Sequence, residues 1–186
     1  HGIPGSLMSM IGMSLLDRIV LEKDIFIPSK ILNELHNELL EALNQDESYA
    51  SDGMDIGICC IVGDQLMYSG AKHHLYFIED NEIKVAKGSR RAIGDERLLS
   101  HLAYEDITIN IEGKQQFFML TDGYHDQIGG PDNRKYMVGR LKSLLLENAV
   151  HPLNEQKKIL EEELDNWMSY GNQEQIDDVL ILSFKI

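Results

Sequence analysis

The chain has 186 residues, of which 43% are hydrophobic, and its formal net charge is −14 at pH 7. This length and composition are sufficient for one domain with a substantial core. The negative charge argues against nucleic acid or anionic lipid as the main partner. No apolar run reaches the roughly eighteen residues that would insert directly into a membrane.

Helices are predicted at the start of the chain and strands after them. Apolar residues at helical spacing indicate a helix over residues 5–22. Pro28 opens a second helix over 28–43 with an apolar stripe. The next elements are strands, with tight turns at Gly63-Asp64 and Asp80-Asn81. They are expected at 55–62, 65–71, 74–79 and 83–87.

The second half of the chain alternates strands with paired helices. We expect a hairpin of strands 107–111 and 115–120 around Glu112-Gly113, helices at 136–148 and 153–169, and a last strand at 179–186. Tight turns between strands favour an α/β (α+β) fold in which helices cover antiparallel sheets. There is no glycine-rich phosphate loop between a strand and a helix.

The two cysteines, Cys59 and Cys60, are adjacent and therefore face opposite sides of a strand. They cannot form a framework disulfide, and their spacing does not match a zinc site. Their pattern suits a reducing, cytoplasmic location.

Two acidic motifs stand at the ends of apolar runs. Thr121-Asp122-Gly123 follows an apolar strand, and Asp177-Asp178 precedes the last one. If the two strands are neighbours, Asp122 and Asp177 can share a metal site. Carboxylate oxygens are the ligands that Mg²⁺ and Mn²⁺ prefer. A pair of such ions lowers the pKa of a bound water, so that hydroxide attacks phosphorus near neutral pH.

The motifs, in this order, resemble the SpoIIE-like branch of the PPM (type 2C) metal-dependent serine/threonine protein phosphatases. The resemblance spans the chain. Its residues are His1-Gly2-Ile3-Pro4-Gly5-Ser6-Leu7-Met8-Ser9-Met10, Asp52-Gly53-Met54-Asp55, Tyr68-Ser69-Gly70-Ala71-Lys72-His73, Ala92-Ile93-Gly94, Thr121-Asp122-Gly123-Tyr124-His125-Asp126-Gln127 and Asp177-Asp178-Val179.

The resemblance implies a β-sandwich of antiparallel sheets flanked by helices, with two manganese or magnesium ions between the sheets. It implies hydrolysis of phosphoserine or phosphothreonine in a protein, for example an anti-sigma-factor antagonist of the STAS type. By position, Asp122 and Asp177 are metal ligands. Gly123 is the turn residue and Asp178 a supporting carboxylate.

The family also uses an earlier aspartate, followed by a Gly-His-Gly sequence, as a metal ligand. Only the tail of that motif, His1-Gly2, is present, and Gly2 is a weaker candidate for a metal contact. We therefore expect residues 1–186 to be a single phosphatase domain truncated at its first strand. An upstream sensor region is expected to lie outside this sequence. On this interpretation the fragment alone binds metal poorly and has little or no activity.

Several further residues are candidates for contacts with substrate phosphate. They are Lys72, His73, Arg90, Arg91 and His125, of which His125 could also donate a proton to the leaving alkoxide. For each of them a polar loop role is an open alternative. Asp55 could lie near the metals or cap a turn. The first helix is compatible with a homodimer through the N-terminal helices, or with core packing.

Two other functions remain open at this stage. The first is a non-catalytic binding or scaffold domain of the same fold, since one metal-ligating aspartate is missing. The second is hydrolysis of a small phosphoester or nucleotide. The substrate, the controlling signal, the oligomeric state and any membrane anchoring of a longer parent protein are not given by the sequence.

Overall fold

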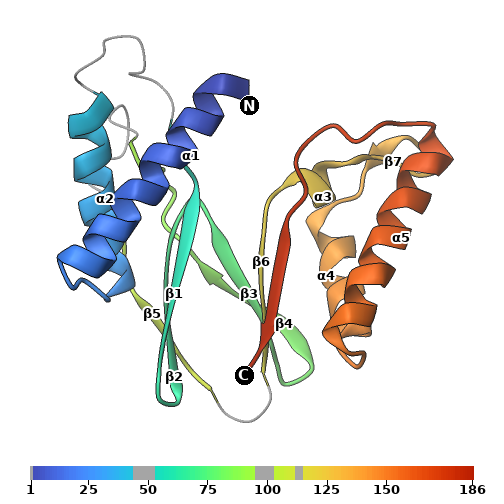
Figure 1. The fold of residues 1–186 in the computed structure, drawn as a ribbon. Coiled ribbons are helices and arrows are strands. Elements are labelled where there is room, and N and C mark those ends of the chain that lie inside the picture. Colours follow the sequence, from blue (N-terminus) through green and yellow to red (C-terminus); the bar gives the residue numbers. More distant parts are fainter. Residues whose placement is uncertain (1, 44–52, 95–102, 112–114) are drawn as a thin grey trace. The chain divides into compact units, whose positions relative to one another are not determined.

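In the computed structural model, the residues described are 2–43, 53–94, 103–111 and 115–186. They form two units, residues 1–75 with 86–112 and residues 76–85 with 113–186. Figure 1 shows the elements of both units, which are described separately below. Among the described residues, no helix is long and apolar enough to cross a membrane.

Unit 1 combines helices with a three-stranded sheet. Its sheet order is β1-β2-β5 and its pairings are antiparallel. The β1–β2 turn is tight, because Val62 pairs with Gln65 and Gly63 takes a positive φ of 61°. Its elements are α1 (Gly2–Asp17), η1 (Arg18–Glu22), α2 (Pro28–Leu43), β1 (Ile56–Val62), β2 (Gln65–Ala71) and β5 (Ile107–Asn110).

The predicted stripe of α2 forms the core of unit 1. Leu32, Leu35 and Leu39 are fully buried, and they pack with Ile19 and Ile93 in one cluster. The helix predicted over 5–22 is α-helical only to Asp17, because a π-helical turn follows it. In this turn the Lys23 N–H donates to the Arg18 carbonyl, 3.1 Å away. Periodicity alone does not reveal such an insertion.

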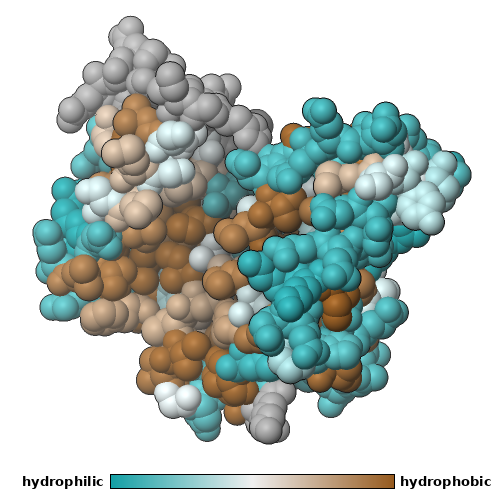
Figure 2. Space-filling view, turned by 45° about the vertical axis from the view of Figure 1, so that its right-hand side comes forward, coloured by the Kyte–Doolittle hydropathy of each residue, from teal (hydrophilic) through white to brown (hydrophobic). Residues whose placement is uncertain are grey.

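The outer face of the first helices remains apolar and exposed. Met10, Met13 and Leu21 are 69%, 67% and 72% exposed. On the face drawn in Figure 2, apolar side chains (brown) reach the surface among hydrophilic ones (teal).

Unit 2 contains a four-stranded sheet covered by helices. The strand order is β4-β3-β6-β9, so β9 lies at an edge. The fully buried Phe118 and Leu141 pack with Tyr124 and Leu164, which joins the sheet to α4 and α5. Its elements are β3 (His74–Glu79), β4 (Glu82–Lys87), β6 (Gln116–Leu120), α3 (Gly123–Asp126), β7 (Ile128–Gly129), β8 (Arg134–Lys135), α4 (Val138–Asn148), α5 (Leu153–Gly171) and β9 (Ile181–Lys185).

The prediction of helices with antiparallel sheets is confirmed, but two local predictions are wrong. The strands β5 and β6 do not form a hairpin, since β5 pairs with β2 and β6 pairs with β9. A turn sequence such as Glu112-Gly113 indicates that the chain changes direction, but it does not determine which strands pair. Residues 112–114 themselves lie outside the described part of the chain. The helix predicted from Tyr136 begins at Val138, because Met137 has a φ of 75°.

A buried carboxylate ties the π-helical turn to α2. Glu38 is 8% exposed and forms ion pairs with Arg18 and Lys23, both at 2.7 Å. Burial opposes ionisation of Glu38, but hydrogen bonds from Lys23 and Arg18 outweigh it. Its pKa therefore lies below its ordinary value of 4.5.

A carboxyl with a lowered folded-state pKa stabilises the fold above its unfolded pKa, and this contribution is lost as the pH falls through the folded pKa. Glu38→Gln should therefore lower the free energy of unfolding at pH 7, and the difference from wild type should shrink as the pH falls below 4.5. Urea denaturation across this range measures it. The exposed Glu162→Gln is the control; a constant Glu38→Gln difference at all pH values would contradict the prediction.

Candidate metal centre

The two acidic motifs meet because β6 and β9 pair. Leu120, the last residue of β6, lies opposite Ile181, the first residue of β9, in an antiparallel register. The chain that leaves β6 therefore runs beside the chain that enters β9. The condition set by the sequence, that the two strands be neighbours, is met.

Thr121 joins the two motifs directly. Its hydroxyl donates to the Asp178 carbonyl at 2.9 Å and accepts from the Leu180 N–H at 2.9 Å. Its own N–H donates to the Leu180 carbonyl at 3.0 Å. One side chain thus satisfies two backbone groups of the segment that follows Asp177.

Gly123 permits the closest approach between the motifs. A Cβ atom at this position would lie 2.4 Å from the Asp178 carbonyl oxygen. Such a contact is far inside van der Waals distance, so any side chain would push the two segments apart. Glycine is therefore required at position 123 for a second reason besides the turn, because the backbone of Asp178 lies so close to it.

The two candidate ligands differ in their surroundings. Asp122 is exposed at the end of β6, whereas Asp177 is half-buried. The Asp178 N–H donates to Asp177 Oδ1 at 2.7 Å, which orients that carboxylate. Asp178 itself is exposed.

This donor set fits a hard divalent cation. Carboxylate and carbonyl oxygens suit Mg²⁺ and Mn²⁺, and the set contains no soft ligand. Within the described ranges there is no group of three or more His, Cys, Asp or Glu side chains able to hold a metal ion. Asp122 and Asp177 thus offer part of a coordination sphere.

The short helix α3 places other polar groups close to Asp122 in the chain. His125 is half-buried, and its Nδ1 is a buried atom without a hydrogen-bond partner among the described residues. Asp126 pairs with Lys135 at 2.8 Å. The Tyr124 hydroxyl donates to the Leu160 carbonyl at 2.9 Å, and burial raises the pKa of this phenol.

The remaining candidates lie in unit 1, so the structure does not test their relation to Asp122. Gly2 is the first residue of α1. Lys72 is exposed with a φ of 48°, and its N–H donates to Ser89. The half-buried His73 accepts a hydrogen bond from Tyr68 through its carbonyl at 2.8 Å.

The two arginines have different environments within unit 1. Arg90 is exposed, whereas Arg91 is half-buried. The Arg91 guanidinium lies 5.6 Å from the centre of the Tyr104 ring and contacts the buried His36. Both contacts of Arg91 involve residues of unit 1. Asp55, the other candidate of this unit, is exposed and lies immediately before β1.

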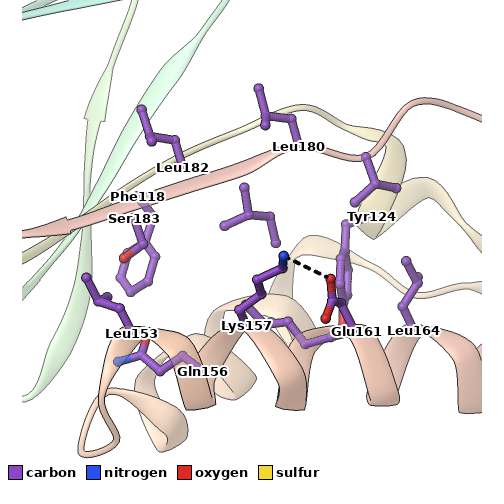
Figure 3. Close-up of a pocket in the computed structure, with 13 residues that line it drawn as sticks. Phe118, Tyr124, Leu153, Gln156, Lys157, Glu161, Leu164, Leu180, Leu182 and Ser183 are labelled. Atoms are coloured by element: carbon purple, nitrogen blue, oxygen red, sulfur yellow. Dashed lines mark hydrogen bonds and ion pairs between the residues drawn. The ribbon is translucent and has the colours of Figure 1, made fainter.

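A separate cavity of about 410 Å³ lies between β9 and α5 (Figure 3). Its walls are mainly apolar, including Phe118, Leu164 and Leu182. Lys157 and Glu161 on α5 form an ion pair at 3.6 Å. Neither Asp122 nor Asp177 lines this cavity.

Gln127 is the last residue of the motif that contains Asp122, and the sequence assigns it no role of its own. It is fully buried, and its side chain bonds to the segment that leads to Asp177. The one sequence feature that could have pointed to Gln127 is its position shortly after Asp122. A glutamine at this position does not by itself predict that the side chain is buried or that it bonds to a segment about fifty residues away.

Comparisons with known proteins agree on one family. The whole chain, residues 1–186, matches the family described as Stage II sporulation protein E (SpoIIE). No curated protein sequence is significantly similar to it.

Solved structures extend the comparison. A SiaA-PP2C domain of Pseudomonas aeruginosa is 31% identical with a TM-score of 0.84, over 100% of this chain and 72% of that one. The phosphatase domain of the cell fate determinant SpoIIE from Bacillus subtilis is 14% identical with a TM-score of 0.55, over 94% and 73%. The catalytic domain of the serine/threonine phosphatase PstP, solved with two manganese ions, is 11% identical with a TM-score of 0.65, over 97% and 81%.

The close approach at Gly123 gives a direct test of the site geometry. Gly123→Ala should lower the free energy of unfolding by about 1–3 kcal/mol, the usual cost of overpacking. Gly139→Ala in α4 is the matched control, because nothing lies within 4 Å of its added Cβ. Urea denaturation measures both; equal stability of the two variants would contradict the described contact.

Proposed function

Because the chain belongs to the SpoIIE family of PPM (PP2C-type) serine/threonine protein phosphatases, we propose that it hydrolyses phosphoserine or phosphothreonine in a regulatory protein with Mn²⁺ or Mg²⁺ held at Asp122 and Asp177. The observation that supports this most is the direct contact between the two acidic motifs through Thr121 and Gly123. The manganese ions of the PstP structure agree with the choice of metal.

Each residue of the centre has a proposed part in this reaction. When bound, Mn²⁺ or Mg²⁺ would lower the pKa of a water molecule and so supply hydroxide for attack on phosphorus. Asp122 offers an exposed carboxylate, and Asp177 offers one already oriented by the Asp178 N–H. Asp178 supports the site through its backbone, and Gly123 leaves space for it.

His125 is the proposed proton donor to the leaving alkoxide. It stands three positions after Asp122 in α3, and its Nδ1 lacks a partner among the described residues. A proton donor must come within hydrogen-bond reach of the leaving oxygen, directly or through one water. Lys72, His73, Arg90 and Arg91 are proposed phosphate contacts by sequence position.

The proposed substrate is a phosphorylated protein regulator in bacterial signalling, such as a STAS-domain anti-sigma-factor antagonist. Family membership supports this choice. The adjacent residues Cys59 and Cys60 form no disulfide bond, which suits a reducing compartment, so we place the reaction in the cytoplasm.

In a longer protein that extends upstream of His1, Asp122→Asn should reduce manganese-dependent hydrolysis of a phosphoserine peptide by about 100-fold or more, since an amide oxygen lacks the negative charge with which a carboxylate holds a hard divalent cation. Mn²⁺ should also raise the melting temperature of the wild type, and this shift should disappear in the variant.

Asp165→Asn on α5 is the matched control, because this aspartate is exposed and belongs to neither motif. It should retain both the activity and the shift. Unchanged turnover in Asp122→Asn would overturn the assignment of the metal centre.

We also propose that the exposed apolar face of α1 and η1 forms a homodimer interface. Met10, Met13 and Leu21 are each more than 60% exposed, which is typical of a surface that another molecule covers. In a monomer this apolar face would be in contact with water, which is less favourable than its burial in a dimer.

Met10→Lys combined with Met13→Lys should convert a dimer into a monomer, because charge would replace the apolar contact. Light scattering coupled to gel filtration measures the mass. Met137→Lys, which is 60% exposed in unit 2, should leave the dimer intact. A wild type that is monomeric at tens of micromolar would contradict this interface.

A further inference from the structure

Gln127 is a fully buried polar residue whose side-chain groups are all satisfied. Its exposed fraction is 0%. Nε2 donates to the carbonyls of Ile128 and Glu174, both at 2.9 Å, and Oε1 accepts from the Ile176 N–H at 3.1 Å. Two of these three bonds go to the segment immediately before Asp177.

Gln127 is itself anchored to the rest of unit 2. Its carbonyl accepts from Trp167 Nε1 at 3.1 Å and from the Tyr136 N–H at 2.9 Å. The Trp167 and Tyr136 rings pack edge to face with centroids 5.1 Å apart. The backbone of Gln127 is therefore held by α5 and by the chain that enters α4.

The segment before β9 is held mainly by hydrogen bonds, which also include Gln173 Nε2 to Asn133 and Gln175 Nε2 to the Asp177 carbonyl. None of residues 172–180 is buried, and the apolar side chains Ile176 and Leu180 are 55% and 63% exposed. Without much apolar burial, backbone hydrogen bonds decide its conformation. Thr121 fixes the end after Asp177, and Gln127 fixes the end before it.

We propose that Gln127 is a positioning residue that holds Asp177 in the orientation needed for metal binding. This inference rests on the proposed function, because Asp177 has to be a metal ligand. Groups that orient metal ligands typically change metal affinity by 10–100-fold when they are removed. The bonds from Gln127 act on the backbone on the N-terminal side of Asp177, so it would act through that residue and not on the metal.

The test compares two buried glutamines of the same unit. Gln127→Met removes the amide at nearly constant length. Gln116→Met is the matched control, since Gln116 is 4% exposed and its Nε2 donates to Gln156 and Ser183 rather than to the 174–176 segment. Both variants remove a buried side-chain amide together with its hydrogen bonds, so both should lose stability.

Two measurements separate positioning from stability. In metal-free protein, amide hydrogen exchange at Ile176 should become at least tenfold faster in Gln127→Met and stay unchanged in Gln116→Met. In a titration with Mn²⁺ alone, followed by the electron paramagnetic resonance signal of the free ion, Gln127→Met should bind at least tenfold more weakly. Gln116→Met should bind as the wild type does.

The outcomes are distinct. Equal exchange at Ile176 in both variants, or faster exchange with unchanged Mn²⁺ affinity, would overturn the proposal. If the wild type of the longer protein, extended upstream of His1, binds no Mn²⁺, the proposed function fails, and the exchange data alone decide whether Gln127 holds the segment of Asp177. If Gln127→Met does not fold, Gln127→Glu replaces it, because the carboxylate still accepts from Ile176 but cannot donate to Glu174.

Discussion

The antiparallel pairing of β6 with β9 is the constraint on which the candidate metal centre depends. The two aspartates stand about fifty residues apart in the chain, and no local interaction could bring them together. Backbone hydrogen bonds place the end of one strand beside the start of the other, with Leu120 opposite Ile181. A shift of register by one residue would turn every side chain of β9 to the opposite face of the sheet. Packing of the half-buried Ile181 against the cluster of the buried Phe118 therefore also fixes the register that places Asp177.

Contacts of small and polar residues then fix the position of the segment around Asp177, which strand pairing alone sets only approximately. Gly123 lets the backbone approach the Asp178 carbonyl, and Thr121 bonds to both sides of Val179. Gln127 reaches the same segment from the other direction. All of these contacts lie where an exposed loop leads into the edge strand β9. In such a loop, side-chain hydrogen bonds replace the apolar burial that fixes the interior strands.

The candidate metal ligands and the apolar cavity of unit 2 lie on the same chain segments but are separate features. Tyr124 and Val179 line the cavity, whereas Asp122 and Asp177 do not. In unit 1 a carboxylate has a structural role, because the buried Glu38 holds the π-helical turn to α2 through ion pairs with Arg18 and Lys23. The net charge of −14 thus combines structural carboxylates, candidate ligands and solvated surface.

The sequence by itself determined most of the helices and strands and the identity of the candidate ligands. The α2 stripe, the strand β2 and the acidic ends at Asp122 and Asp177 all follow from local patterns that short-range sterics and burial impose. Only the tertiary structure decided which strands pair, because the partner of β6 is β9 and not its neighbour β5. It also decided the start of α4 at Val138 and the contacts of Gln127 with Glu174 and Ile176. Those depend on backbone conformation and long-range contacts, and the letters of the sequence carry no periodic signal for either.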